Sequence, residues 1–281
     1  MTTGKLYLVP TPIGNLKDIT LRALEVLKMV DIIAAEDTRQ TLKLLNHYEI
    51  KKSLVSYHKF NENTKGEDII EMLTDGKQVA IVTDAGTPGI SDPGSVIVSK
   101  CIEKGIGFDV LPGATAVTTA LVYSGLDTTK FMFKGFVPRE NKERIPFIED
   151  IKDRKETIIF YEAPHRLRET LSFLLDRLGD RSIAICRELT KLHEEILRYN
   201  ISEAIDYYTK VEPRGEYVLV VQGKSEEEIL KEKKSLWENL TIEEHIKKYM
   251  EDGLSKKDAI KKVAKERALS KSEVYSHSID I

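Results

Sequence analysis

The stretch from Val79 to Gly94 reads VAIVTDAGTPGISDPG. It opens with four apolar residues, Val79 to Val82, which predict a short buried β-strand. The residues after Thr83 are crowded with glycine, proline and aspartate, which together form stiff and tightly turned loops. Loops at the carboxyl ends of strands in open α/β sheets are the usual ligand sites. We therefore predict a strand, Val79 to Thr83, followed by a ligand-binding loop, Asp84 to Gly94.

Two more loops of this kind follow predicted strands. Pro10 to Asn15 follows the strand Leu6 to Val9, and Pro112 to Ala116 follows the strand Phe108 to Leu111. Each loop alone is compatible with an ordinary strand-to-helix turn. Because the carboxyl ends of parallel strands meet at one edge of a sheet, the three loops together predict a pocket.

The first half of the chain alternates short β-rich runs, including Ile32 to Ala35, with helical patterns. This alternation is typical of βα units around a largely parallel sheet. One helix follows the N-cap candidates Asp18 and Thr20, and another follows Pro112-Gly113. We expect both helices to cover this sheet with the apolar residues Leu21, Leu24, Leu27, Val30, Ala114, Val117 and Leu121.

From about Phe131 the predicted strands come closer together, which favours a second α/β domain with a mixed sheet. A leucine stripe between Leu167 and Leu178, ended by Gly179, predicts one core helix of this domain. The strands are Phe131 to Val137, Thr157 to Tyr161, Ser182 to Cys186, Ile196 to Tyr199 and Tyr217 to Gln222.

The tail beyond Lys224 is different in character. It opens with the charged run Glu226 to Lys234, and three pairs with capping spacing follow: Thr241 with Glu244, Ser255 with Asp258, and Ser270 with Glu273. Three short helices in this space predict a helix-turn-helix-like miniature domain. We therefore expect an α/β protein with three parts, at residues 1–125, 126–224 and 225–281.

The tail is also basic. From Gly253 to Tyr275 it carries seven Lys or Arg against three Asp or Glu, whereas the whole chain has a net charge of −3. A local contact with nucleic acid is one interpretation, and a solvated lysine-rich face is the other. The helical spacing favours RNA.

Composition restricts the class of protein. A hydrophobic fraction of 41% and a charged fraction of 32% over 281 residues are typical of globular domains. No run approaches the roughly 18 apolar residues of a membrane span, and Met1 to Pro10 lacks the pattern of a signal peptide. The two cysteines, Cys101 and Cys186, lie in apolar contexts without metal spacing. We expect a cytoplasmic protein that does not contact a membrane.

Several nucleotide and metal signatures are missing. There is no GxxxxGK[ST], and the GxG at Gly105 and Gly107 leads into a strand instead of opening a helix. His165 and His193 belong to no HExxH or Cys/His cluster. These observations disfavour a Walker-type site, a Rossmann dehydrogenase and a metal site.

Charged clusters follow three predicted strands: Glu36 to Arg39, Glu162 to Arg166, and Arg187 to Lys191. Arginine presents a fork that matches phosphate oxygens, and carboxylates can orient a substrate or accept a proton. The same clusters are also compatible with structural salt bridges.

Four of these segments carry a resemblance. Leu8 to Leu16 (LVPTPIGNL), Ala35 to Arg39 (AEDTR), the Asp84 to Gly94 loop and Tyr161 to Arg166 (YEAPHR) together resemble the ribosomal RNA small subunit methyltransferase I family, over nearly the whole chain. The resemblance implies a two-domain tetrapyrrole-methylase fold, S-adenosylmethionine in the cleft between the domains, and a homodimer. It also implies 2'-O-methylation of a cytidine ribose in the decoding centre of 16S ribosomal RNA, within the small ribosomal subunit.

Site residues follow from the resemblance and from strand-end placement. The resemblance implies that the cofactor is bound by Pro10, Thr11, Pro12, Gly14, Asp84, Ala85, Gly86, Thr87, Ile90, Ser91, Gly113, Thr115, Ala116, Phe136 and Ala163. Strand-end placement motivates Glu162 or Glu188 as base or substrate orienter, and Arg39 as a phosphate or alkoxide contact. Methyl transfer to a hydroxyl mainly requires alignment, so no metal is expected.

Two other functions stay open. The loops do not specify the acceptor, so a methylase of the same fold that acts on a tetrapyrrole or a protein side chain is one alternative. The other is a non-catalytic RNA-binding assembly factor with an inherited cleft.

Overall fold

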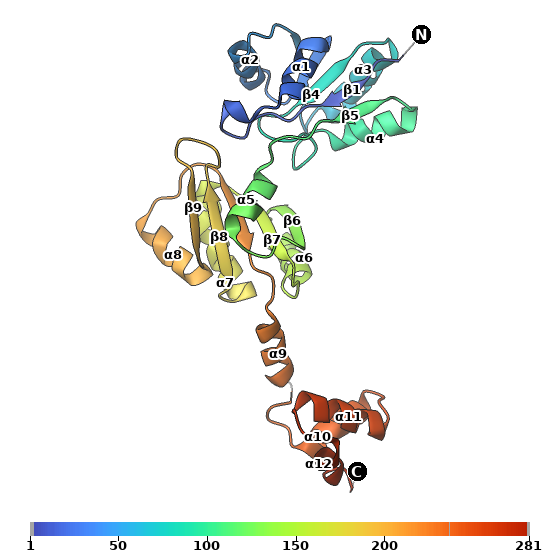
Figure 1. Ribbon diagram of the computed structural model, residues 1–281, viewed down its shortest axis with the longest axis vertical. Helices are drawn as coiled ribbons and strands as arrows, with labels where there is room; N and C mark the ends of the chain where they lie inside the picture. The colour runs from blue at the N-terminus through green and yellow to red at the C-terminus, as the bar shows by residue number, and fades with distance from the viewer. Residues whose placement is uncertain (1–2, 236, 280–281) are drawn as a thin grey trace. The chain divides into compact units, whose positions relative to one another are not determined.

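The computed structural model describes residues 3–235 and 237–279. Two compact units make up the chain, unit 1 at Met1–Gly223 and unit 2 at Lys224–Ile281 (Figure 1). Unit 1 contains two five-stranded sheets, and unit 2 is helical.

The first sheet was predicted to be largely parallel and is parallel throughout, in the order β3-β2-β4-β1-β5. Its strands are β1 (Leu6–Leu8), β2 (Ile32–Ala35), β3 (Ser53–Ser56), β4 (Val79–Val82) and β5 (Phe108–Val110). Apolar side chains project from both faces of this sheet, and helices bury them on each side. Helices α1 (Leu21–Met29) and α2 (Thr38–His47) cover one face, and α3 (Glu62–Thr74) and α4 (Ser95–Lys104) cover the other (Figure 1). All five carboxyl ends therefore meet at one edge.

The second sheet is mixed, as predicted, in the order β6-β7-β10-β8-β9. Only β6 and β7 run parallel; the other neighbours are antiparallel. The strands are β6 (Phe131–Phe136), β7 (Thr157–Glu162), β8 (Ser182–Arg187), β9 (Glu195–Asn200) and β10 (Tyr217–Val221). One face packs on α6 (Asn141–Ile151), α7 (Leu167–Leu178) and α8 (Ile201–Lys210).

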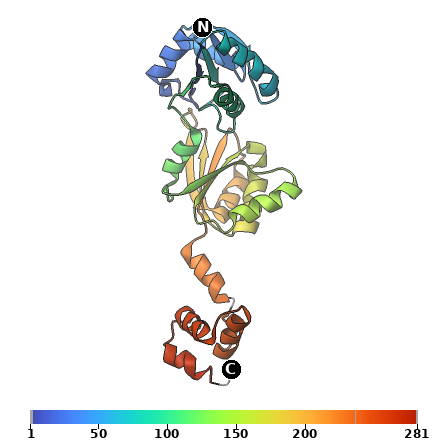
Figure 2. The ribbon, with the colours of Figure 1, turned by 90° about the vertical axis from the view of Figure 1, so that its right-hand side faces the viewer.

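Helix α5 (Ala116–Ser124) covers the opposite face of this second sheet (Figure 2). Its buried residues Val117, Ala120 and Leu121 pack with residues of β8 and β10, including Cys186 and Val218. The prediction that this helix covers the first sheet is therefore wrong. The helical spacing shows which face is buried, but not which sheet receives it.

Unit 2 consists of α9 (Glu226–Ser235), α10 (Ile242–Glu251), α11 (Lys256–Glu266) and α12 (Lys271–Ser276). Thr241, Ser255 and Ser270 each accept a backbone N–H at the start of a helix, which confirms the predicted capping pairs. Ile246, Val263 and Val274 belong to the core of the last three helices. Residues 236, 280 and 281 of the predicted 225–281 part lie outside the described residues.

Two 3-10 turns complete the described elements, η1 (Leu16–Asp18) and η2 (Pro164–Arg166). None of the described helices combines the length and apolar character that a membrane crossing requires.

Candidate active site

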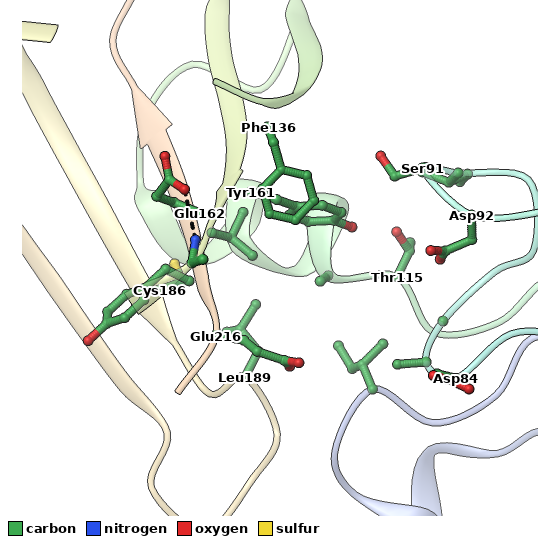
Figure 3. Close-up of a pocket in the computed structure, with 18 of the residues that line it drawn as sticks. Asp84, Ser91, Asp92, Thr115, Phe136, Tyr161, Glu162, Cys186, Leu189 and Glu216 are labelled. Atoms are coloured by element: carbon green, nitrogen blue, oxygen red, sulfur yellow. Dashed lines mark hydrogen bonds between the residues drawn. The ribbon is translucent and has the colours of Figure 1, made fainter. Parts of the chain in front are cut away.

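A cavity of about 440 Å³ lies in unit 1 at the carboxyl edge of the first sheet. One wall comes from residues after β2 and β4 and from the start of α5, including Glu36, Asp84 and Thr115. The other comes from the ends of β6, β7 and β8 and from the start of β10. Figure 3 shows Asp84, Ser91, Asp92 and Thr115 on one side, and Cys186, Leu189 and Glu216 on the other.

The three predicted loops are joined by hydrogen bonds. Thr11 and Gly86 exchange backbone hydrogen bonds at N···O distances of 2.9 and 3.0 Å, and the Thr11 hydroxyl donates to the carbonyl of Thr83. The Thr87 hydroxyl donates to the carbonyl of Ala114 at 3.1 Å. The loops after β1, β4 and β5 thus form one scaffold at the cavity, as the glycine- and proline-rich sequence predicts.

Gly14 brings the first loop against the second sheet. A Cβ at this position would lie 2.5 Å from the side chains of Thr190 and Lys191, so only glycine fits. The next residue, Asn15, donates its backbone N–H to the Thr190 hydroxyl at 3.0 Å. The neighbouring Ile13 packs in the same cluster as Leu189. These contacts hold the two walls of the cavity together.

Three carboxylates gather on the first wall. The backbone N–H of Asp84 donates to Glu36 at 3.3 Å, and that of Asp37 donates to Asp84 at 3.1 Å. Burial raises the pKa of both Glu36 and Asp84. Burial, followed by repulsion from Glu36 and Asp84, raises the pKa of Asp92 to about 6. This wall is therefore complementary to a cationic ligand.

Aromatic rings line the opposite side. Phe136 and Tyr161 meet edge to face with ring centroids 5.7 Å apart, and Phe136 keeps 53% of its surface exposed (Figure 3). Burial, followed by the charge of Asp92, raises the pKa of Tyr161 to about 12, so that its hydroxyl stays neutral. Such a surface suits a flat, uncharged ring.

Glu162 is one of the lining residues, but its carboxylate is buried and held on several sides. It accepts the Thr170 hydroxyl at 2.5 Å and the backbone N–H of Ala163 at 2.8 Å, and it lies 3.5 Å from Arg166. With 2% of its surface exposed, it contributes to the structure of the wall.

Lys191 lines the cavity while two carboxylates hold its ammonium. Its Nζ lies 3.0 Å from Glu188 and 2.8 Å from Glu216. Partial burial acts to lower the pKa of Lys191, but the bonds to these carboxylates outweigh it and raise the pKa. For Glu188, burial acts to raise the pKa, but the Glu216 backbone N–H and Lys191 outweigh it, so the pKa is lowered. Lys191 therefore stays charged.

The match to known families identifies the fold. The sequence model of the family described as Tetrapyrrole (Corrin/Porphyrin) Methylases matches residues 5–205. The chain belongs to the tetrapyrrole methylase family. This membership confirms the expectation, drawn from the resemblance, that the protein is an enzyme that transfers methyl groups.

Curated relatives of this methylase carry the family name inferred from its motifs. It is 53% identical over 272 residues to the ribosomal RNA small subunit methyltransferase I of Bacillus subtilis, covering 97% of this chain and 93% of the relative. A protein of the same name from Thermotoga maritima is 48% identical over 221 residues, which are 79% of this chain and 99% of the relative. The resemblance is confirmed.

Solved structures confirm the fold class of this methylase. Diphthine synthase matches with a TM-score of 0.62 at 16% identity, covering 79% of this chain and 91% of that chain. Uroporphyrin-III C-methyl transferase from Thermus thermophilus, complexed with S-adenyl homocysteine, matches with a TM-score of 0.56 at 19% identity, covering 78% of this chain and 97% of that chain.

Ten of the fifteen residues that we expected to bind the cofactor are part of the cavity lining in this methylase. They are Asp84, Ala85, Gly86, Thr87, Ile90, Ser91, Thr115, Ala116, Phe136 and Ala163. Five others, Pro10, Thr11, Pro12, Gly14 and Gly113, lie behind the lining, where Thr11 and Gly14 make the contacts described above. A Cβ on Gly113 would lie 2.5 Å from the Pro10 ring, so these two residues set the packing of the loops. Ile13 lines the cavity in their place.

Two of the expected catalytic residues lie outside the lining. Arg39 is 87% exposed in its side chain and forms an ion pair with Asp37 at 2.8 Å. Glu188 lies behind Lys191. Glu162 alone of these three contributes to the lining.

Sequence reasoning identified Phe136, Glu162 and Ala163 but missed several other lining residues from the second sheet and its loops. Tyr161, Cys186 and Tyr217 belong to strands recognised as core, and Leu189 and Val218 are apolar residues without a chemical signature. Asp92 was placed in the glycine-rich loop without a role. Asp92 lies two residues after Ile90, which we expected to bind the cofactor. This closeness in sequence could have indicated that Asp92 also lines the cavity, since neighbouring residues of one loop tend to face the same ligand.

Proposed function

We propose that this methylase transfers a methyl group from S-adenosylmethionine to ribosomal RNA of the small subunit. We further propose that the acceptor is the 2'-hydroxyl of a cytidine in the decoding centre of 16S RNA, within the small ribosomal subunit in the cytoplasm. The proposal rests on the sequence identity of about half, over nearly the whole chain, to relatives named ribosomal RNA small subunit methyltransferase I. The residues that line the cavity have chemistry that agrees with it.

The cavity fits this methyl donor. A volume of about 440 Å³ lies within the range of small-molecule sites. Glu36 and Asp84 complement a molecule with an ammonium and a sulfonium group, while Phe136, Leu189 and Val218 offer apolar surface to an adenine ring. S-adenosylmethionine supplies an activated methyl group when bound there.

The chain itself aligns the acceptor and excludes water. We assign the exposed Arg39 to a phosphate of the RNA, because Asp37 fixes the direction of its guanidinium through Nε and Nη2. Glu188 and Glu216 hold the Lys191 ammonium at the cavity, where it stabilises negative charge on the acceptor. Glu162 orients the end of β7 from its fixed position.

Unit 2 supplies an RNA contact in this proposal. The exposed lysines of α11 and its flank are Lys257, Lys261, Lys262, Lys265 and Lys271. Phosphate contacts by lysine carry affinity without sequence information, which suits an accessory unit that does not contain the catalytic cavity.

A second copy of the chain is the proposed partner at α5. Val122 is 76% exposed and Leu192 93% exposed. The Tyr123 hydroxyl donates to Glu194 at 3.4 Å, which ties the end of α5 to the loop that carries Leu192. An apolar pair of this exposure is expected to be covered in a homodimer. Light scattering should show a dimer that Leu192→Glu converts to a monomer.

The function is tested by incubating the protein with methyl-labelled S-adenosylmethionine and small ribosomal subunits from a strain without the enzyme. Label on one cytidine ribose supports the proposal, and parallel reactions with naked RNA identify the preferred substrate. Transfer to a tetrapyrrole or a protein instead would establish the first alternative. Cofactor binding without any transfer would contradict the proposed acceptor, and absence of both would favour an assembly factor.

A further inference from the structure

We propose that Asp92 accepts the proton of the hydroxyl that this enzyme methylates. This inference rests on the proposed function, because it requires a hydroxyl acceptor in the cavity. It moves the role of base away from Glu162 and Glu188.

Hydrogen bonding separates Asp92 from the other carboxylates at the cavity. Glu162 accepts two hydrogen bonds and pairs with Arg166, and Glu216 pairs with Lys191. Among the described residues, no hydrogen bond or ion pair reaches the Asp92 side chain. A base must have a lone pair available to its substrate, and Asp92 meets that requirement.

The remaining two carboxylates are also engaged. Glu36 accepts the backbone N–H of Asp84, and Asp84 accepts that of Asp37. Both bonds stabilise the charged form and hold these side chains at the sheet edge. They are better suited to attract a cation than to take up a proton.

Asp92 points into the cavity. Figure 3 shows its carboxylate directed toward Thr115 and the Tyr161 hydroxyl, across the space that the ligand would fill. The loop that carries it is tight, because Gly89 donates its N–H to the Pro93 carbonyl at 3.1 Å and Gly94 packs on Gly89. The backbone that carries Asp92 is therefore held in place before the substrate arrives.

Charge around Asp92 tunes it for this role. The titratable residues that line the cavity together with Asp92 are Glu36, Asp84, Tyr161, Glu162, Cys186, Lys191, Glu216 and Tyr217. Burial, then repulsion from Glu36 and Asp84, places the pKa of Asp92 at about 6. A carboxylate near this value is ionised at neutral pH yet accepts a proton more readily than an ordinary aspartate.

The proposed step conserves atoms and electrons. Asp92 accepts the hydroxyl proton while the oxygen forms its new bond to the methyl carbon, and the carbon–sulfur bonding pair returns to sulfur, which leaves as a neutral thioether. No other reactant than the sulfonium methyl donor is needed.

The test is Asp92→Asn, which keeps the size of the side chain and removes the base. We expect kcat/KM with small-subunit RNA to fall by about 100-fold or more, the usual contribution of a general base. The Kd for S-adenosylhomocysteine, measured by calorimetry, should change by less than about threefold. In the unaltered protein kcat/KM should rise with pH through about 6 and then level off, and the Asn variant should lose that rise.

Asp92→Glu is the matched variant, because it restores a carboxylate at a shifted position. We expect it to recover part of the rate and the dependence on pH. Retained activity in Asp92→Asn overturns the base role, and so does a loss of S-adenosylhomocysteine affinity as large as the loss of rate, since Asp92 would then bind the cofactor. If the unaltered protein binds S-adenosylhomocysteine but methylates no RNA, the proposed function fails and the base role falls with it.

Discussion

Gly86 shows how one residue without a side chain shapes the cavity. Its φ is +84°, and a Cβ there would lie 3.4 Å from Ile13 and 3.6 Å from the carbonyl of Ala114. Gly86→Val should raise the Kd for S-adenosylhomocysteine by about tenfold or more, because its branched side chain needs space at the cavity lining and strains the turn. Isothermal titration calorimetry measures this.

Gly105 provides the control for backbone strain. It also has positive φ, at +66°, but nothing lies within 4 Å of its Cβ position. Gly105→Val should destabilise the fold by about 1 kcal/mol or more and leave ligand affinity unchanged. Equal losses of affinity in both variants would show that Gly86 acts through stability alone.

Glu162 is the second test at this scale. Glu162→Gln should reduce the free energy of unfolding by about 1–3 kcal/mol, because Arg166 and Thr170 lose a buried charged partner. Turnover should also fall, while affinity for S-adenosylmethionine stays nearly intact. Thr170→Val, which keeps the carboxylate, should lose less of both. Unchanged turnover in Glu162→Gln would remove Glu162 from the mechanism.

At the site, the sequence predicted those parts of the cavity where glycine and proline constrain the backbone. Glycine and proline mark the loops with Gly86 and Gly113, so the first wall could be predicted. Arg39 and Glu188 also follow strands, but a strand end does not reveal whether a side chain turns toward the cavity. Asp37 and Lys191 hold these two side chains elsewhere.

Single helices and strands were likewise predictable where the local sequence pattern is strong, and not where their position depends on distant parts of the chain. The apolar runs of β4 and β10 predicted both strands to within a residue. The edge strand β3 was missed, because Ser53–Ser56 is half exposed and holds only two apolar residues. The sheet on which α5 packs depends on where the chain crosses from the first sheet to the second, and no local sequence pattern indicates that position.

Helix α11 carries a prediction about RNA. The double variant Lys257→Glu, Lys261→Glu should weaken RNA binding, and the slope of log affinity against log salt should be shallower by about two units. Fluorescence anisotropy with a small-subunit RNA fragment measures both. Lys28→Glu with Lys210→Glu, at the ends of α1 and α8, makes the same charge change in unit 1. If that control weakens binding as much, the effect is one of net charge and α11 is not the contact.

The whole molecule contains one tryptophan, and it reports on unit 2 alone. Trp237 stacks on His245 at 5.4 Å, and Arg267 donates its Nε–H to His245 Nδ1 at 3.2 Å. Burial, followed by the charge of Arg267, lowers the pKa of His245 below 6.5. The unfolded state therefore binds the proton more readily than the folded one.

Unit 2 should lose stability as the pH falls below about 6.5 toward the lowered pKa of His245. The urea midpoint of Trp237 fluorescence should be lower at pH 5.5 than at pH 8. His245→Gln removes the titrating group and should reduce the difference between the two midpoints. A midpoint that rises on acidification would contradict the assignment.

The division into two units predicts that unit 1 folds and binds the cofactor without unit 2. The Thermotoga maritima relative matches 221 residues of this chain with 99% of its own length, so it has no room for both units. Truncation after Gly223 should keep S-adenosylhomocysteine affinity within about threefold and reduce methylation of RNA by about tenfold, since lysine contacts are lost. Full activity in the truncated chain would exclude unit 2 from RNA binding.

The place of β10 also sets the order of assembly during synthesis. It is the last strand of the second sheet to leave the ribosome, yet it lies in the middle, between β7 and β8. Until Tyr217–Val221 emerges, both of those neighbours present an open edge that other strands can join. A chain cut short before Tyr217 is therefore not a smaller enzyme but a substrate for chaperones and proteases.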